Sequence, residues 1–74
     1  MTKGEYRVGI NPSDDDLVGQ IKRQAADLID LIDSIPEKDT LGGIERVRLK
    51  AQALRELEGA TMWAVKAATK PLME

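Results

Sequence analysis

Residues 17–35 read LVGQIKRQAADLIDLIDSI, and this stretch decides the fold. Its apolar positions recur at spacings of 3, 4, 3, 4 and 3 residues, in the order Val18, Ile21, Ala25, Leu28, Ile32 and Ile35. Such spacing is typical of a helix with one apolar seam. Leu17, Ile29 and Leu31 widen the apolar face beyond the narrow stripe that one partner helix covers. The pattern therefore predicts a long helix in contact with more than one neighbour.

We expect this helix over about residues 14–35. Ser13 is the predicted N-cap, and the three aspartates at 14–16 fill the first turn, where they face the positive end of the helix dipole. Successive helical side chains point in different directions, so helix-start electrostatics explains this acidic triplet better than a metal site does. Pro36 ends the helix near Ser34.

A second helix is predicted over about residues 44–70, after a connection at 36–43 in which Asp39 or Thr40 is a candidate cap. Its seam follows heptad steps through Val47, Ala51, Leu54, Glu58, Thr61, Val65 and Ala68. Small residues around Gly59 suit an interhelix contact, or alternatively a pocket wall. The fold class is therefore all-α, an antiparallel two-helix hairpin at residues 13–74.

Residues 1–12 are predicted to form a short N-terminal arm, extended because Tyr6, Val8 and Ile10 alternate with other residues. A chain of 74 residues without cysteine or histidine has neither disulfides nor an ordinary zinc site to stabilise it. Association of subunits is the remaining means, so we expect a homo-oligomer.

Composition excludes several function classes. The net charge of −2 argues against binding DNA or anionic membranes, and the apolar runs are too short to span a bilayer. The N-terminal residues do not resemble a signal peptide, so the default compartment is the cytosol. Without histidine or cysteine, the commonest nucleophile–base pairs are missing. We therefore expect a binding protein, not an enzyme, with no metal or cofactor.

Two basic positions in the first half are candidates for binding an anion. Tyr6 lies beside Arg7 in the predicted arm, where a ring and a cation can clasp a nucleobase and a phosphate. Packing of Tyr6 on the hairpin is the alternative. Lys22 follows Ile21 at the edge of the apolar face, where it can reach an anion held between subunits or simply snorkel to water.

A second candidate stripe lies near the C-terminus. Trp63, Lys66 and Lys70 fall at i, i+3 and i+7, an arrangement that can stack a base and hold phosphates. The alternative is a tryptophan at an interface between subunits, surrounded by solubilising lysines. The residues alone therefore indicate an oligomeric helical hairpin that binds an anionic ligand with an aromatic ring.

These residues also resemble a known family. Tyr6-Arg7, then Ile21-Lys22, then MWAVKAATKP at residues 62–71 are similar, in order and spacing, to the helical-hairpin domain of phage anti-CBASS sponge proteins. One class of Thoeris anti-defence sponge shares this domain. The resemblance runs from about Tyr6 to Pro71.

The resemblance implies a function. Such proteins bind the cyclic oligonucleotide messengers of bacterial CBASS systems in the cytoplasm of the infected host, without cleaving them, so that the effector is not activated. Members form hexamers with cyclic dinucleotides, such as cyclic GMP–AMP, between protomers. Some members have separate sites for cyclic trinucleotides.

Carried onto this chain, the resemblance makes Tyr6 the residue that stacks on a base and Lys22 the residue that meets a phosphate. The interval between them is about one residue longer than the family pattern. The trinucleotide site uses an arginine of the second helix, for which Arg55 and Lys66 are both candidates; Lys66 would lack the fork geometry of arginine. The rival hypothesis is a structural or regulatory adaptor that binds another protein. A messenger-degrading phosphodiesterase is disfavoured by the missing histidines and metal ligands.

Overall fold

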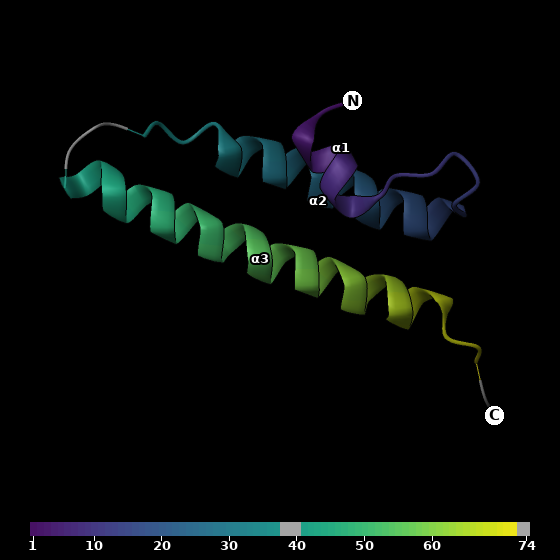
Figure 1. The fold of residues 1–74 in the computed structure, drawn as a ribbon. Coiled ribbons are helices and arrows are strands. Elements are labelled where there is room, and N and C mark those ends of the chain that lie inside the picture. Colours follow the sequence, from purple (N-terminus) through teal and green to yellow (C-terminus); the bar gives the residue numbers. More distant parts are fainter. Residues whose placement is uncertain (38–40, 73–74) are drawn as a thin grey trace.

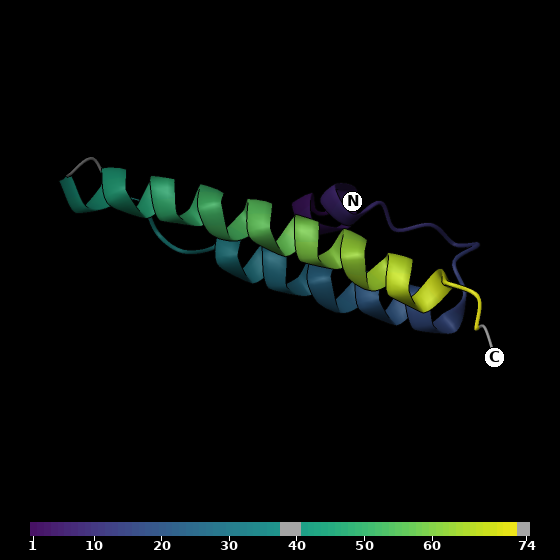
Figure 2. The ribbon, with the colours of Figure 1, turned by 90° about the horizontal axis from the view of Figure 1, so that it is seen from below.

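The computed structural model describes residues 1–37 and 41–72, and it is helical where it is regular. Helix α2 (Asp16–Asp33) and helix α3 (Leu41–Thr69) form an antiparallel hairpin, side by side in two perpendicular views (Figures 1 and 2). Helix α1 (Lys3–Val8) lies across α2. The predicted all-α hairpin is confirmed.

The N-terminal segment corrects one expectation, because residues 3–8 are helical and not extended. Thr2 and Glu5 form a capping box: the Thr2 hydroxyl accepts from Glu5 N, and the Glu5 carboxylate accepts from Thr2 N at 2.7 Å. Gly9 ends the helix at φ 66°, a left-handed conformation that glycine adopts without strain. A helix of six residues is unstable alone, so α1 depends on its packing against the hairpin.

The start of α2 differs from the prediction by two residues. Asp15, not Ser13, is the N-cap, and its carboxylate accepts from Val18 N at 2.8 Å. Only Asp16 lies in the first turn, because Asp14 instead folds back onto the loop and accepts from Asn11 N. The helix has its C-cap at Ser34, as expected from the proline that follows.

Helix α1 approaches α2 at backbone distance. A Cβ built on Gly4 would lie 2.0 Å from the carbonyl oxygen of Ala26, so only glycine fits at this crossing. Gly4 N donates to Asp30 Oδ1 at 2.7 Å, which satisfies a first-turn amide of α1. Two ion pairs flank the crossing, Lys3 with Asp33 and Arg23 with Glu5.

The core between α2 and α3 is small. Its buried apolar residues are Val18, Ala25, Ala26, Ile29 and Leu54. The predicted α3 seam is right at Leu54 and Thr61 but wrong at Val47 and Ala51, which are exposed. Lys50 is buried instead.

Lys50 is buried between the helices because its ammonium donates hydrogen bonds to carbonyl groups at the end of α2. Nζ donates to the carbonyls of Asp33 and Ile35 at 3.0 and 2.9 Å and to Glu37 Oε1 at 2.8 Å. The last carbonyls of a helix lack intrahelical partners, and cations interact favourably with them. A buried lysine therefore joins the two long helices, next to the predicted seam residue Ala51, which is exposed.

Helix α3 begins at Leu41, earlier than the expected residue 44, and ends at Thr69. The capping role considered for Asp39 or Thr40 lies outside the described residues. Arg46 Nη1 donates to the carbonyl of Pro36 at 3.1 Å, a further link across the connection.

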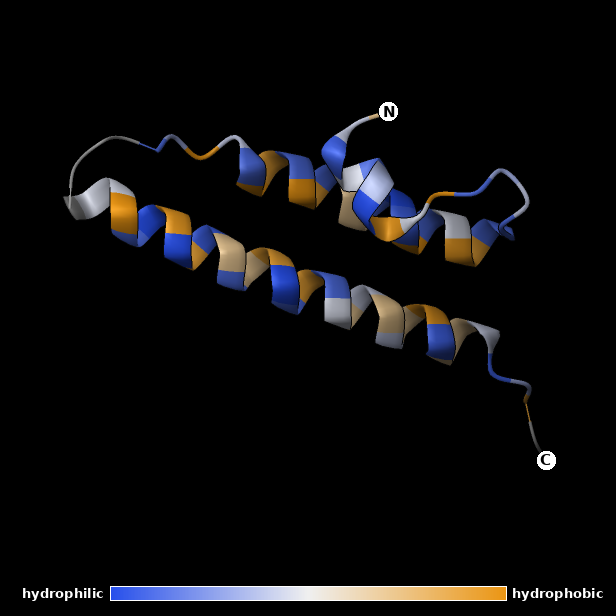
Figure 3. Ribbon diagram, in the orientation of Figure 1, coloured by the Kyte–Doolittle hydropathy of each residue, from blue (hydrophilic) through white to orange (hydrophobic). Residues whose placement is uncertain are grey.

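Much apolar surface stays exposed on both long helices, whose hydrophobic segments recur along their length (Figure 3). The exposed large residues of α2 and its end are Leu17, Leu28, Leu31 and Ile35, and those of α3 are Ile44, Val47, Leu49, Met62 and Trp63. The α2 set lies on one stripe by helical periodicity. Among the described residues, no helix is long and apolar enough to cross a membrane.

The Gly4→Ala substitution should release α1. Its methyl group would collide with the Ala26 carbonyl, and overpacking of this kind typically costs about 1–3 kcal/mol. Urea unfolding followed by circular dichroism, at fixed protein concentration, measures the loss. Gly19→Ala is the matched control, because its Cβ meets open space within α2 and alanine favours a helix by about 0.5–1 kcal/mol. Equal stability of Gly4→Ala and the wild type would contradict the close crossing.

Stability should fall in acid, because bonds from Thr2 N and Arg23 lower the pKa of Glu5 from 4.5 to about 2. A carboxyl group whose pKa is lower in the folded state stabilises the fold above its unfolded pKa, and this contribution is lost as the pH falls toward the folded value. The urea midpoint should therefore drop between about pH 5 and pH 2. Glu5→Gln should flatten this dependence, and an unchanged pH profile in that variant would contradict the assignment.

Candidate functional site

A hollow lies where the end of α1 meets the C-terminal half of α3. Its volume is about 450 Å³, within the range typical of small-molecule sites. The lining residues are Arg7, Val8, Lys22, Glu58, Gly59, Thr61, Met62, Trp63, Val65, Lys66 and Thr69. We call this hollow the cationic cavity, because three bases and one acid line it.

Arg7 reaches the cavity from the last turn of α1. Its Nη1 donates to Glu58 Oε1 of α3, and both side chains are about one-third exposed. This ion pair is the polar link between α1 and α3. The capping box that starts α1 and the Gly4 crossing that positions it therefore decide where the Arg7 guanidinium lies.

Lys22 enters the cavity from the second turn of α2. Its side chain is only 15% exposed, and Nζ donates to Asp14 Oδ2 at 2.9 Å and to the carbonyl of Gly9 at 3.1 Å. The Lys22 ammonium holds the pKa of Asp14 below its usual range, mainly through that hydrogen bond. Lys22 is thus a largely buried cation that joins α2 to the loop after α1.

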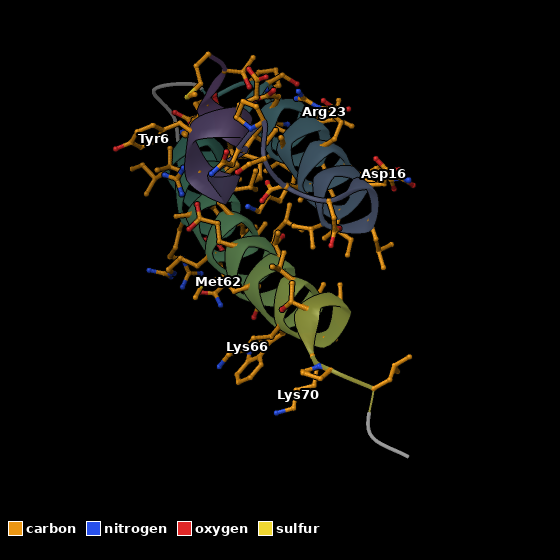
Figure 4. All side chains as sticks on the ribbon, turned by 90° about the vertical axis from the view of Figure 1, so that its right-hand side faces the viewer. Tyr6, Asp16, Arg23, Met62, Lys66 and Lys70 are labelled. Atoms are coloured by element: carbon orange, nitrogen blue, oxygen red, sulfur yellow. The ribbon has the colours of Figure 1, made fainter. Side chains whose placement is uncertain are left out.

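Lys66 and Trp63 come from α3. Lys66 Nζ lies 5.1 Å from the centre of the Trp63 ring, a cation–π distance, and Trp63 is 71% exposed. Lys66 and Met62 project to the same side of the molecule as Tyr6 (Figure 4). The stripe of Trp63 and Lys66 expected from the sequence is therefore present, with its ring accessible.

The structure brings only some of the predicted site residues together. Arg7, Lys22 and Lys66 line one cavity. Tyr6 is 77% exposed on α1 and is not among the cavity's lining residues, so within one chain it does not share a site with Lys22. Arg55 borders a smaller hollow of about 260 Å³, which Arg7 also lines, and its Nη2 donates to Gln52 Oε1 at 2.8 Å.

Sequence reasoning missed Glu58 as a site residue. Its heptad position predicted a polar seam residue between helices, whereas the side chain lines the cavity and pairs with Arg7. The sequence did contain a signal, because an acid at a position between helices needs a partner of opposite charge.

The arrangement of these side chains suits recognition of an anion that carries an aromatic ring. Three cations, one carboxylate and an accessible indole suit phosphates and a nucleobase. Among the described residues, no cluster of acids is arranged to hold a metal ion.

Comparison with known proteins gives one match. A family model described as the Acb2/Tad1 hairpin domain matches residues 3–69, nearly the whole chain. This match confirms the resemblance found in the sequence. No curated protein and no solved structure gives a significant match. The match includes both α1 and the hairpin, which are the elements that build the cationic cavity. The chain therefore belongs to the Acb2/Tad1 hairpin family.

Proposed function

We propose that this chain is a phage anti-defence sponge that sequesters cyclic oligonucleotide messengers and so prevents activation of CBASS effectors. Membership of the Acb2/Tad1 hairpin family supports a sponge-type binding domain. The observation that carries the proposal is the cationic cavity, in which Arg7, Lys22 and Lys66 from three helices converge beside Trp63.

The charges of the cavity suit a cyclic dinucleotide. Such a ligand has two phosphates and two bases, and the lining cations and Glu58 give a net charge of +2. Charge-assisted hydrogen bonds to phosphate are among the stronger polar contacts in proteins. Trp63 offers a face on which a base can stack. The protein acts by binding alone and holds the messenger uncleaved.

Assembly completes the proposed site. The exposed stripe of Leu17, Leu28, Leu31 and Ile35 supports a homo-oligomer, which we propose is the hexamer of the family. A neighbouring protomer would bring an exposed Tyr6 to a ligand that one chain alone holds only from one side. The place of action is the cytoplasm of the infected bacterium, where the messengers are made.

A separate cyclic trinucleotide site would use a base of α3. Arg55 and Lys66 line different hollows, so the two candidates are separable by mutation.

Calorimetric titration with cyclic GMP–AMP tests the proposal. We expect binding, and we expect heat denaturation of the complex to release intact ligand. Lys22→Ala, Lys66→Ala and Tyr6→Ala should each weaken binding, the lysine variants by about 10- to 100-fold, since a charge-assisted bond contributes roughly 1.5–3 kcal/mol. Arg48→Ala is the control, because it removes an exposed cation that pairs with Glu45 outside the cavity.

Two results would overturn this function. Absence of binding to cyclic GMP–AMP and to a panel of other cyclic di- and trinucleotides would favour the adaptor hypothesis. Recovery of linear products would indicate a phosphodiesterase. Binding that survives Tyr6→Ala and Lys22→Ala alike would show that these two residues are misassigned.

Assembly has its own test. Leu31→Glu alters a side chain that is 66% exposed in the single chain, so it should leave the hairpin core intact while placing a charge in the proposed interface. Light scattering should show a large oligomer for the wild type and smaller species for this variant. Leu72→Glu, at a fully exposed position beyond α3, is the control and should assemble normally. A monomeric wild type would exclude the hexamer.

A further inference from the structure

Glu58 is an unexpected residue in a cavity for phosphates. It lies on α3 with a side chain only 30% exposed, and it faces the cationic cavity. A carboxylate repels a dianion, and this one lowers the positive charge of the cavity by a third. Its position calls for a role other than holding phosphate.

The ion pair with Arg7 gives Glu58 such a role. Arg7 engages Oε1, and a carboxylate has about four lone-pair positions, so capacity for further donors remains. The guanidinium likewise carries five N–H donors in a planar fork. The Arg7–Glu58 pair therefore presents donors beside acceptors along one wall of the cavity.

This arrangement matches one edge of guanine. That edge carries the O6 acceptor next to two donors, N1–H and the N2 amino group. Arg7 can donate to O6 while Glu58 accepts from the two N–H groups. On adenine, the ring nitrogen N1 is an acceptor. If adenine took the same place, N1 and the Glu58 carboxylate would face each other as two acceptors with no proton between them, which is unfavourable.

Stacking and phosphate contacts fit the same placement. Trp63 lines the cavity and offers an accessible ring, and Lys22 and Lys66 reach the same space from α2 and α3. A base read by the Arg7–Glu58 pair thus lies near both a ring and two cations.

We propose that Glu58, positioned by Arg7, selects guanine-containing cyclic dinucleotides. This inference rests on the proposed sponge function. The selection acts at a single base edge, and the phosphate contacts stay common to all cyclic dinucleotides.

The test compares cyclic di-GMP with cyclic di-AMP, two ligands of equal charge, by calorimetry. The wild type should bind cyclic di-GMP at least about tenfold more tightly, the usual scale of discrimination by a bidentate base contact. Glu58→Gln should lower or invert that ratio by about tenfold or more, because a glutamine amide both donates and accepts. Glu58→Ala should lower the ratio too, because it removes the acceptor for the guanine N–H groups together with the repulsion of adenine N1.

The ratio within each variant separates recognition from any loosening of α1, which would weaken both ligands equally. Glu56→Gln is the control, because Glu56 pairs with Gln52 on α3, is not a lining residue of the cavity and should keep the wild-type ratio. If Glu58→Gln has the same ratio of affinities for the two ligands as the wild type, the proposed guanine selection is wrong and the sponge function stands. Failure of the wild type to bind either ligand would overturn the selection, and failure to bind cyclic GMP–AMP and the wider panel as well would overturn the sponge function.

Discussion

The contact of Gly4 with the Ala26 carbonyl is the constraint on which the rest of the site depends. Because no Cβ fits there, α1 sits at backbone distance from α2, and its six residues gain a position that their own hydrogen bonds would not hold. That position aims Arg7 at α3 and leaves the Gly9 carbonyl within reach of Lys22. Without the crossing, the cationic cavity would lose the wall that α1 supplies.

Ion pairs within the chain would affect how strongly an anion binds in the cavity. Lys22 already has Asp14, and Arg7 already has Glu58. In the proposed complex, a phosphate would share or replace a carboxylate partner. This exchange would cost part of the new interaction, but the ion pairs orient the partly buried cations beforehand. Lys66, held over the Trp63 ring, forms no ion pair with an acid among the described residues and is the most directly available cation of the three.

Sequence periodicity predicted the hairpin, and Val18 and Ala25 of the predicted α2 seam are buried. Leu28 of that seam is exposed, whereas Ile29 beside it is fully buried. Periodicity failed for α1, although Thr2-Lys3-Gly4-Glu5 carries a capping-box signature, because so short a helix depends on a tertiary contact at Gly4. It also failed at Lys50, whose burial is explained by carbonyls 15 and 17 residues away in sequence. Arg7 and Lys66 were predicted from the sequence as binding residues, and both line the cavity, whereas the contact between Glu58 and Arg7 depends on the distance between helices.

In the proposed oligomer, one chain and its neighbours would have separate roles. Cations that need exact placement are held by contacts within one protomer, as Lys22 and Arg7 are. The large apolar surfaces, including Leu31 and Met62, have no cover within the described chain. Tyr6 is exposed, as the apolar surfaces are, but its ring suits ligand binding, as the cations do. Stacking of the ring on a base would be most favourable where water is excluded from both of its faces. A ligand enclosed between protomers would stabilise the assembly by mass action, so messenger capture and subunit association would reinforce each other.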